Sequence, residues 1–230
     1  MEIKFDNLYL INSSNIDEKD ISFLLQFENE IYDKSFPDDE REYFSDIIER
    51  VKTPKGWEPD TLITLKIIDN KVVGGVISDW YPNSKCLEII YIVLDPQYRG
   101  KGDGYKLLWN SIDIFKEEIG EINNIFIEVE KTHNRSLMEY EMNPSKRIDF
   151  WYKCGAKQMP INYVQPPLSE DKEAIHNLML MLLPLDKDTK SEITKYTLKE
   201  FLKDFYTGLK AENSVFLTNM LNEINEIVGL

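Results

Sequence analysis

Cysteine and histidine are scarce in this sequence, which has two of each in 230 residues. A scaffold stabilised by several disulfides is therefore excluded. A structural Cys2His2 zinc site would need Cys86, Cys154 and both histidines, at spacings that do not suit such a site. We therefore expect a reduced, cytoplasmic protein without a bound metal.

Long apolar runs are also missing. The longest clear run, residues 178–185, includes a proline and is too short to cross a bilayer. The N-terminal ten residues contain acidic side chains and lack the basic-then-apolar layout of a signal peptide. These features favour a protein that is neither secreted nor inserted in a membrane.

Positive charge is the third scarce feature, because 27 Lys and Arg residues face 41 Asp and Glu residues, for a net charge of −14. Such a chain repels polyanions, so we expect neither nucleic acid nor an anionic membrane as its main partner. Cationic ligands such as amines remain compatible. The composition, 42% hydrophobic and 30% charged, is typical of a globular protein.

Hydrophobic periodicity predicts a mixture of strands and helices. Strands are expected at residues 2–11, 62–69, 71–80, 86–94, 124–130, 157–164 and 177–183. Helices are expected at about 15–32, with Asn15 or Asp17 as the N-cap, and at about 38–51, with Asp38 or Asp39 as the N-cap. Further helices are expected at about 104–118 and 145–154, followed by two more within 195–227. This order predicts an α/β (α+β) fold with a mixed sheet. We expect residues 1–185 to form one domain and residues 186–230 a helical extension packed on it.

Three glycines, Gly100, Gly102 and Gly104, stand at alternate positions between the buried strand 86–94 and the following helix. Such glycines let the backbone turn tightly and expose N–H groups that can hold a phosphate at a helix N-terminus. Arg99 and Lys101 add positive charge. The spacing matches neither the dinucleotide fingerprint nor the P-loop. The glycines alone would also suit a plain strand–helix turn, so both interpretations stay open.

The same segment resembles a known family. The run Gln97-Tyr98-Arg99-Gly100-Lys101-Gly102-x-Gly104 is similar to motif A of the GNAT acetyltransferases, Q/R-x-x-G-x-G/A. The preceding Val93-Leu94-Asp95-Pro96 and the later Phe150-Trp151-Tyr152-Lys153-Cys154-Gly155-Ala156 also resemble that family. The resemblance covers residues 60–185 and implies the GNAT fold, with the C-terminal extension outside the common core.

This resemblance implies that acetyl-CoA binds and that its acetyl group passes directly to a primary amine in a ternary complex. The backbone N–H groups of residues 98–104 would hold the pyrophosphate, and the backbone at Val93 and Leu94 would pair with the pantetheine arm. The implied donor-binding residues are Val93, Leu94, Gln97, Tyr98, Arg99, Gly100, Lys101, Gly102, Asp103 and Gly104. Asp103 departs from the apolar residue common there, and we expect its carboxylate to face solvent or to cap the helix.

Two residues are candidates for proton transfer. Glu88 lies on strand 86–94, where some family members carry a glutamate base, and its apolar neighbours should raise its pKa. The alternative is a glutamate that faces solvent. The usual acid is a tyrosine four residues before the helix-ending glycine, a position that Trp151 occupies here. Either Tyr152 serves as the acid, or it only packs and no side-chain acid is used.

The acceptor site is expected from aromatic and acidic residues. The resemblance places it near the break within residues 28–40, with Tyr32 and Phe36 as contacts, although a solvated acidic loop is an equal alternative. Glu128 and Glu130 share a strand face, and we expect one, taken as Glu130, to line the acceptor site and the other to face water. Two adjacent prolines at 166 and 167 predict a sheet edge or a bend.

Two alternatives concern the function itself. Trp151 at the tyrosine position allows a non-catalytic acyl-CoA-binding sensor or scaffold instead of an enzyme. A longer acyl-CoA would fit the same motif as donor. The chain is expected to be a monomer or a homodimer.

Overall fold

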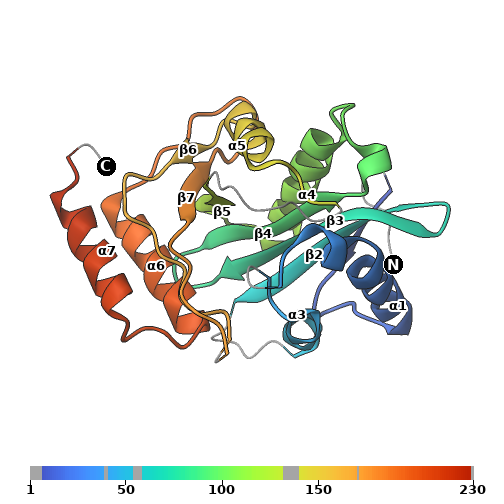
Figure 1. Ribbon diagram of the computed structural model, residues 1–230, viewed down its shortest axis with the longest axis horizontal. Coiled ribbons are helices and arrows are strands. Elements are labelled where there is room, and N and C mark those ends of the chain that lie inside the picture. Colours follow the sequence, from blue (N-terminus) through green and yellow to red (C-terminus); the bar gives the residue numbers. More distant parts are fainter. Residues whose placement is uncertain (1–6, 39–40, 54–58, 132–139, 170, 229–230) are drawn as a thin grey trace. The chain divides into compact units, whose positions relative to one another are not determined.

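The computed structural model describes residues 7–38, 41–53, 59–131, 140–169 and 171–228 (Figure 1). The chain divides into two compact units. The first comprises residues 1–80, 89–121 and 135–142, and the second comprises residues 81–88, 122–134 and 143–230. The seven strands of the described residues form a mixed sheet flanked by helices, which confirms the predicted fold class.

The first unit contains four neighbouring strands in the order β1-β2-β3-β4. They are β1 (Leu8–Ile11), β2 (Asp60–Ile68), β3 (Lys71–Tyr81) and β4 (Cys86–Leu94), although Tyr81 and the first three residues of β4 belong to the second unit. β2 pairs with β1 and β3 in antiparallel register. β4 is buried along most of its length, as expected for a central strand.

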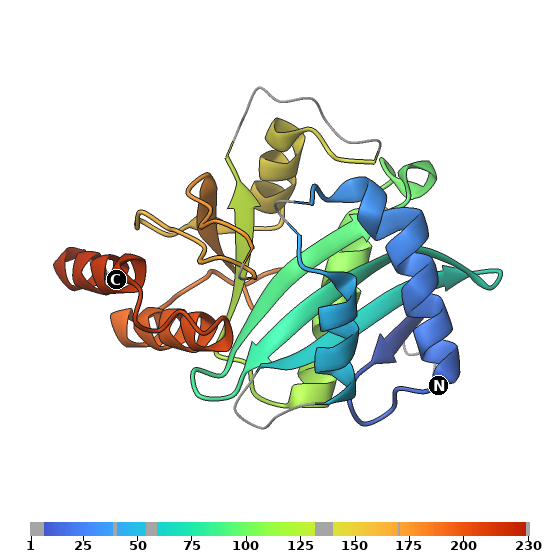
Figure 2. The same ribbon diagram turned by 60° about the horizontal axis from the view of Figure 1, so that its bottom comes forward.

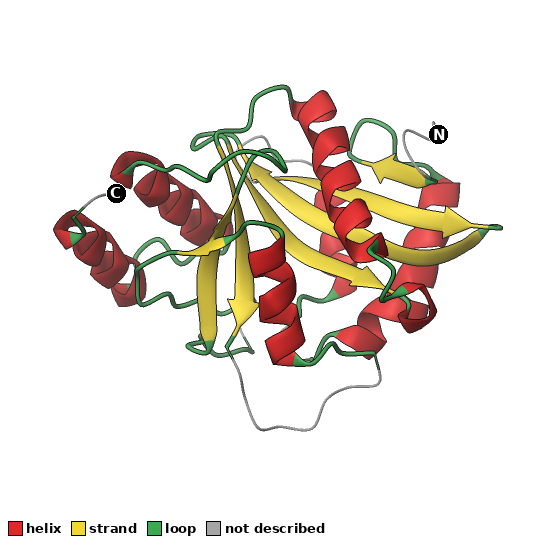
Figure 3. Ribbon diagram, turned by 90° about the horizontal axis from the view of Figure 1, so that it is seen from above, coloured by secondary structure: helices red, strands yellow, loops and turns green. Residues whose placement is uncertain are grey.

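Helices cover both faces of the first unit's strands. The face with Ile63 and Leu65 packs against α1 (Glu18–Phe27) and α3 (Phe44–Lys52), which lie on the same side in Figure 2. Alternate residues of β2 point to the other face, where Thr64 Oγ1 lies 2.6 Å from Ser111 Oγ of α4 (Asp103–Ile119). Figure 3 shows α4 running across that face. The unit therefore has three layers, with the glycine loop at the start of α4.

The second unit is built on β5 (Asn124–Glu130), β7 (Leu178–Leu183) and the short β6 (Lys157–Gln158), in the order β5-β7-β6. Its helices are α5 (Pro144–Lys153), α6 (Lys195–Gly208) and α7 (Val215–Glu226). Apolar side chains of β5 and β7 pack on α6, where the rings of Phe126 and Phe201 stack with centroids 4.0 Å apart. The faces of β5 and α6 thus share one hydrophobic core.

Most predicted elements are confirmed, and four differ. The strand expected at residues 2–11 is described only as 8–11, with residues 1–6 outside the described ranges. The strand expected at 157–164 ends at 158, because the N–H groups of Ile161 and Tyr163 bond to carbonyls two residues back and cannot pair with a neighbour. The first helix turns π-helical at Glu28–Tyr32 and continues as the short α2 (Asp33–Ser35).

The second predicted helix starts later than expected. Asp38 was a candidate N-cap, but its carboxylate pairs with Arg41, which also binds Asp33. The helix begins at Phe44 with Tyr43 as its N-cap residue. The other candidate cap, Asp39, lies outside the described residues. For α1, by contrast, one of the two candidate caps, Asp17, is confirmed, because its side chain accepts from the N–H of Asp20.

Gly74 allows β3 to lie close to β4. A Cβ at this position would stand 2.6 Å from the carbonyl oxygen of Val93 and 2.5 Å from Leu94 Cδ2. Because the carbonyl belongs to a buried strand, it cannot move aside easily. Gly74→Ala is therefore expected to lower the free energy of unfolding by about 1–3 kcal/mol. Urea unfolding measures this, and an unchanged midpoint would contradict the close packing.

Both cysteine thiols are buried, and burial raises the pKa of each to about 12. Because only the thiolate is a good nucleophile, we expect neither cysteine to react with dithiobis-nitrobenzoate in the native protein at weakly alkaline pH. Both should react after unfolding in guanidinium. Rapid labelling of the native protein would show that one of the two thiols is exposed.

Within the described ranges, no helix combines the length and the apolar character that are needed to cross a bilayer.

Candidate functional site

The glycine loop joins β4 to α4 through a short 3₁₀ turn at Pro96–Tyr98. Asp95 organises this turn, since its carboxylate accepts from the N–H of Gln97 and its carbonyl accepts from the N–H of Tyr98 at 2.9 Å. The N–H of Arg99 bonds to the carbonyl of Pro96. The N–H groups of residues 97–99 are therefore used inside the loop, so N–H groups that can reach a ligand start at Gly100.

The N-terminus of α4 has a bare backbone. Gly100 and Gly102 adopt positive φ angles of 88° and 81°, a region that favours glycine, and Gly102 is the N-cap residue. A Cβ at either glycine would meet nothing within 4 Å, and no side chain of the described residues caps the helix. The first turn of α4 consequently has no side-chain cap and open space beside its two glycines, and the helix dipole favours an anion at such a position.

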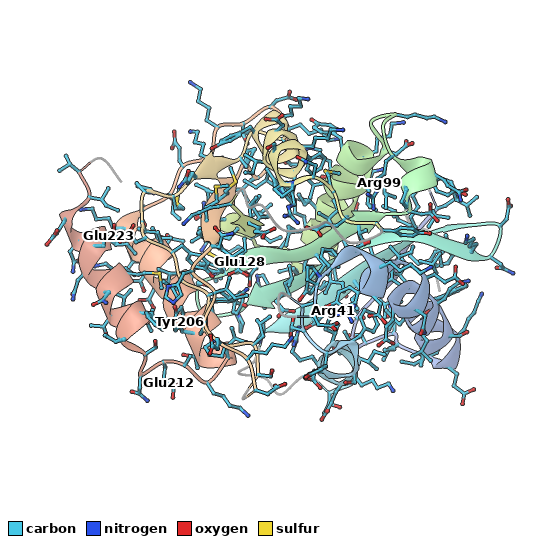
Figure 4. The ribbon with its side chains drawn as sticks, in the orientation of Figure 1. Arg41, Arg99, Glu128, Tyr206, Glu212 and Glu223 are labelled. Atoms are coloured by element: carbon cyan, nitrogen blue, oxygen red, sulfur yellow. The ribbon has the colours of Figure 1, made fainter. Side chains whose placement is uncertain are left out.

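The charged side chains of the loop have defined partners. Arg99 turns inward, where its Nε donates to the carbonyl of Leu94 at 2.7 Å, and burial lowers the pKa of its guanidinium (Figure 4). Asp103 pairs with Lys106 at 3.5 Å along the helix surface, while Lys101 is exposed. Arg99 thus fixes the end of β4, and the carboxylate of Asp103 is partly neutralised beside the open N–H groups.

Val93 and Leu94, the predicted contacts of the pantetheine arm, are both buried at the end of β4. The Leu94 carbonyl already accepts from Arg99, and the next N–H, that of Asp95, donates to the carbonyl of Val73 at 2.9 Å. The Val93 carbonyl also lies toward Gly74 of β3, so a ligand that pairs with this stretch of β4 would have to use other backbone groups than these three.

Glu88 is fully buried on β4 and belongs to the second unit. The hydroxyl of Tyr81 donates to its Oε2 at 2.9 Å. The alternative, in which Glu88 faces solvent, is therefore wrong. The hydrogen bond from Tyr81 holds the buried carboxylate of Glu88 in one orientation, and a general base must be positioned in this way.

Trp151 and Tyr152 lie side by side on α5 but differ in exposure. Trp151 is 5% exposed, whereas Tyr152 is 50% exposed. Because successive residues point about 100° apart on a helix, only one of them can face the core. The residue four before Gly155 is therefore a buried tryptophan, and the neighbouring phenol is directed largely to solvent.

Tyr32 and Phe36 belong to an aromatic group of the first unit that also includes Tyr91. The hydroxyl of Tyr32 donates to the carbonyl of Glu42 at 3.1 Å, and the N–H of Glu42 donates to the hydroxyl oxygen of Tyr91 at 2.9 Å. Burial raises the pKa of both phenols, so both remain protonated. These tyrosines hold the segment between α2 and α3 in place, and Phe36 is the more exposed of the two predicted acceptor contacts.

Arg41 offsets part of the negative charge of the predicted acceptor segment. Its guanidinium binds Asp33 at 2.6 Å, also pairs with Asp38, and lies 5.7 Å from the centre of the Tyr32 ring (Figure 4). Residues 39 and 40 lie outside the described ranges. The described part of this segment therefore contains a cation of its own among its acidic side chains.

On β5, Glu128, the glutamate expected to face water, is half-buried and has side-chain partners. Glu130 is 6% exposed and pairs with Arg147 of α5. Glu128 accepts hydrogen bonds from the hydroxyl of Tyr163 and from the side-chain amide of Gln165. Both carboxylates are therefore held by side chains from later in the sequence.

Sequence reasoning missed Tyr81, Tyr91, Tyr163 and Gln165. No periodic pattern marks them, because each acts through a partner distant in the chain; Tyr163 and Glu128 are 35 positions apart. The only signal was the pair of prolines after Gln165, which predicted an edge or bend. Among the described residues, no group of three or more His, Cys, Asp or Glu side chains is arranged to hold a metal ion.

Comparison with known proteins gives a family match. The model of the acetyltransferase (GNAT) family matches residues 21–143, more than half of the chain. A comparison with curated proteins found no match.

Two solved structures have folds similar to that of this chain. A protein from Bacteroides thetaiotaomicron, described as an acetyltransferase of the GNAT family, is 17% identical with a TM-score of 0.58, over 89% of this chain and 98% of that one. Escherichia coli ElaA is 12% identical with a TM-score of 0.50, over 77% of this chain and 98% of its own. At these identities the two structures support the fold alone.

Proposed function

Because the chain belongs to the GNAT family of acetyltransferases, we propose that it is an N-acetyltransferase that uses acetyl-CoA. The acetyl group would pass directly to a primary amine of a small or peptidic acceptor, with both substrates bound at once. The observation that carries the proposal is the bare N-terminus of α4, where open N–H groups follow two glycines with positive φ.

The residues at this N-terminus fit the donor. The N–H groups from Gly100 to Tyr105 have no acceptor among the described residues, and phosphate oxygens are suitable acceptors at a helix N-terminus. The free space beside Gly100 and Gly102 lets a phosphate approach the backbone. Lys101 would add charge, and the backbone near Val93 and Leu94 would pair with the pantetheine amides.

In the proposed reaction, the amine nitrogen attacks the thioester carbonyl carbon after losing a proton. A C–N bond forms, the nitrogen releases its second proton to water, the C–S bond breaks, and the thiolate leaves and is then protonated. Glu88 would accept the amine's proton through a water molecule, while the hydroxyl of Tyr81 keeps its carboxylate oriented. Tyr152, exposed on α5, would protonate the thiolate, and Tyr32, Phe36 and Glu130 would contribute to acceptor binding.

A non-catalytic acyl-CoA-binding module is the second candidate. It is favoured by Trp151, which is buried where the family resemblance places a tyrosine acid. A protein that binds the donor without a usable acid and acceptor would serve as a sensor or scaffold.

The proposal also covers the partners, the location and the domain organisation of the protein. The net charge of −14 supports a cationic acceptor and disfavours nucleic acid or an anionic membrane as partner. We place the enzyme in the cytoplasm, as a monomer or homodimer, with residues 1–185 as the acetyltransferase domain. Residues 186–230 would be an extension packed on that domain, which the stacking of Phe201 on Phe126 supports.

Titration calorimetry followed by a thiol-release assay tests this proposal. The full chain is titrated with acetyl-CoA and with a longer acyl-CoA, and CoA release is then followed over a panel of primary amines. We expect saturable binding and amine-dependent release; the protected cysteines keep the background of the thiol reagent low. Binding of acetyl-CoA without release of CoA would support the non-catalytic acyl-CoA-binding module. If neither acyl-CoA binds, both candidate functions are contradicted.

A further inference from the structure

A polar cluster of one half-buried and two buried side chains lies in the second unit, outside the glycine loop. Its centre is Glu128 on β5, which accepts from the hydroxyl of Tyr163 and from the side-chain amide nitrogen of Gln165. Glu128 shares its strand face with Phe126, which packs on α6. The labels in Figure 4 locate Glu128 on β5 and Tyr206 on α6. The cluster therefore stands at the edge of an apolar core.

Gln165 provides an acceptor that nothing in the described protein satisfies. The residue is 6% exposed, and its Oε1 is buried without a hydrogen-bond partner. Rotating the amide would not help, because it would turn Oε1 toward the Glu128 carboxylate, where two acceptors would repel each other. A buried unsatisfied oxygen costs about 1–3 kcal/mol, so a donor from a ligand would stabilise it.

Two carboxylates act on the Tyr163 hydroxyl of this cluster. The pKa of the Tyr163 hydroxyl lies well above its usual value, chiefly because of burial, and the charges of Glu128 and Glu88 raise it further. Both carboxylates therefore act on the same phenol, which remains a proton donor. The surroundings of Gln165 Oε1 thus favour a cationic ligand over an anionic one.

The backbone around Gln165 is held at several points. Its N–H and carbonyl exchange hydrogen bonds with Ile175 at 3.0 and 2.9 Å, and two prolines follow it. The preceding carbonyl, that of Val164, accepts from the hydroxyl of Tyr206 at 2.6 Å. Gln165 is therefore fixed in place, so its unpaired oxygen is a feature of the fold rather than of a loose loop.

We propose that Glu128 and Gln165 bind a primary ammonium group of the acyl acceptor, which makes the acceptor an aliphatic primary amine. The inference rests on the proposed function only in naming the bound amine as the acceptor. An ammonium carries a positive charge and three N–H donors, which match a carboxylate and an amide oxygen. A divalent cation is disfavoured, because it needs six or more oxygen ligands and both carboxylate oxygens already accept hydrogen bonds.

Ligand-observed NMR on the full chain, with butylamine as the probe, tests the site without any acyl donor. We expect butylamine to bind at neutral pH, whereas tetramethylammonium, which has the charge but no N–H, and butanol, which lacks the charge, should bind far more weakly. Glu128→Gln and Gln165→Met should each weaken butylamine binding by about tenfold or more. The exposed Glu212→Gln, which removes the same charge in the same unit, should leave binding unchanged.

The outcomes separate the site from the proposed reaction. Absent butylamine binding, equal binding of tetramethylammonium, or binding that both variants retain would overturn the inference. If Gln165→Met does not fold, Glu128→Gln, which keeps the shape of the side chain, carries the test alone. Acetyl transfer that both variants leave intact overturns the site while the proposed function stands. Specific amine binding without any transfer supports the ammonium site and counts against the proposed function.

Discussion

Gly102→Val is expected to raise the dissociation constant of acetyl-CoA by at least about 100-fold, because two or more charge-assisted hydrogen bonds are worth several kcal/mol together. Gly102 is the N-cap residue of α4, and a Cβ there would extend into space that holds no protein atom within 4 Å. That space is where the phosphates would approach the first-turn N–H groups. Titration calorimetry of the purified variant measures the change.

Gly120→Val is the matched control for backbone strain. Gly120 ends the same helix, has a φ of 86°, and a Cβ there would also meet nothing within 4 Å. Valine is disfavoured at positive φ at both sites, so both variants should lose stability to a similar degree. Only Gly102→Val should lose the donor. Unchanged affinity in a folded Gly102→Val, or an equal loss in both variants, would contradict the assignment of the loop.

Glu88→Gln is expected to lower kcat by about 100-fold to 10,000-fold, the usual contribution of a general base, with little change in acetyl-CoA affinity. Glutamine keeps the shape of the side chain and can still accept from the hydroxyl of Tyr81, but it cannot take a proton. Steady-state kinetics with a saturating amine measures the effect. The acid side of the pH profile of kcat should flatten in the variant.

Two further variants make the Glu88 result interpretable. Glu212→Gln removes an equal charge from an exposed position and should leave kcat unchanged. Tyr81→Phe removes only the orienting hydroxyl, and its effect should be smaller than that of Glu88→Gln. A Glu88→Gln enzyme with the parent's kcat and pH profile would show that another group, or water alone, accepts the proton.

Strong local patterns made much of the fold predictable. The bounds of β4 and β5 agree with the sequence prediction, because both are short β-rich runs between clear turn signals. The end of α5 was also predictable, since Gly155 takes the positive φ that commonly follows a helix. These elements depend on the residues within them and on their immediate flanks.

Elements that depend on distant partners were not predictable. The start of α3 moved because Arg41 takes the carboxylate of the expected cap, Asp38. The strand expected after Lys157 ended early because the backbone turns twice before Tyr163. Neither contact leaves a periodic signal in the sequence.

In the candidate site, too, local features were predictable from the sequence and long-range contacts were not. The glycine loop was predictable because the backbone itself requires glycine there, at Gly100 and Gly102. Which loop N–H groups remain open to a ligand was not, since Asp95 and the following proline take those of residues 97–99. The partners of Glu128 come from a segment more than thirty residues later, and only the three-dimensional structure brings them together.

Quantifying both products of one reaction tests the central claim most directly. The full chain is incubated with acetyl-CoA and a primary amine such as butylamine, and mass spectrometry measures free CoA and the acetylated amine. The proposed function predicts that both form in equal amounts and that neither forms without the amine. CoA release without acetylated amine, or no release from a protein that binds acetyl-CoA, would contradict it.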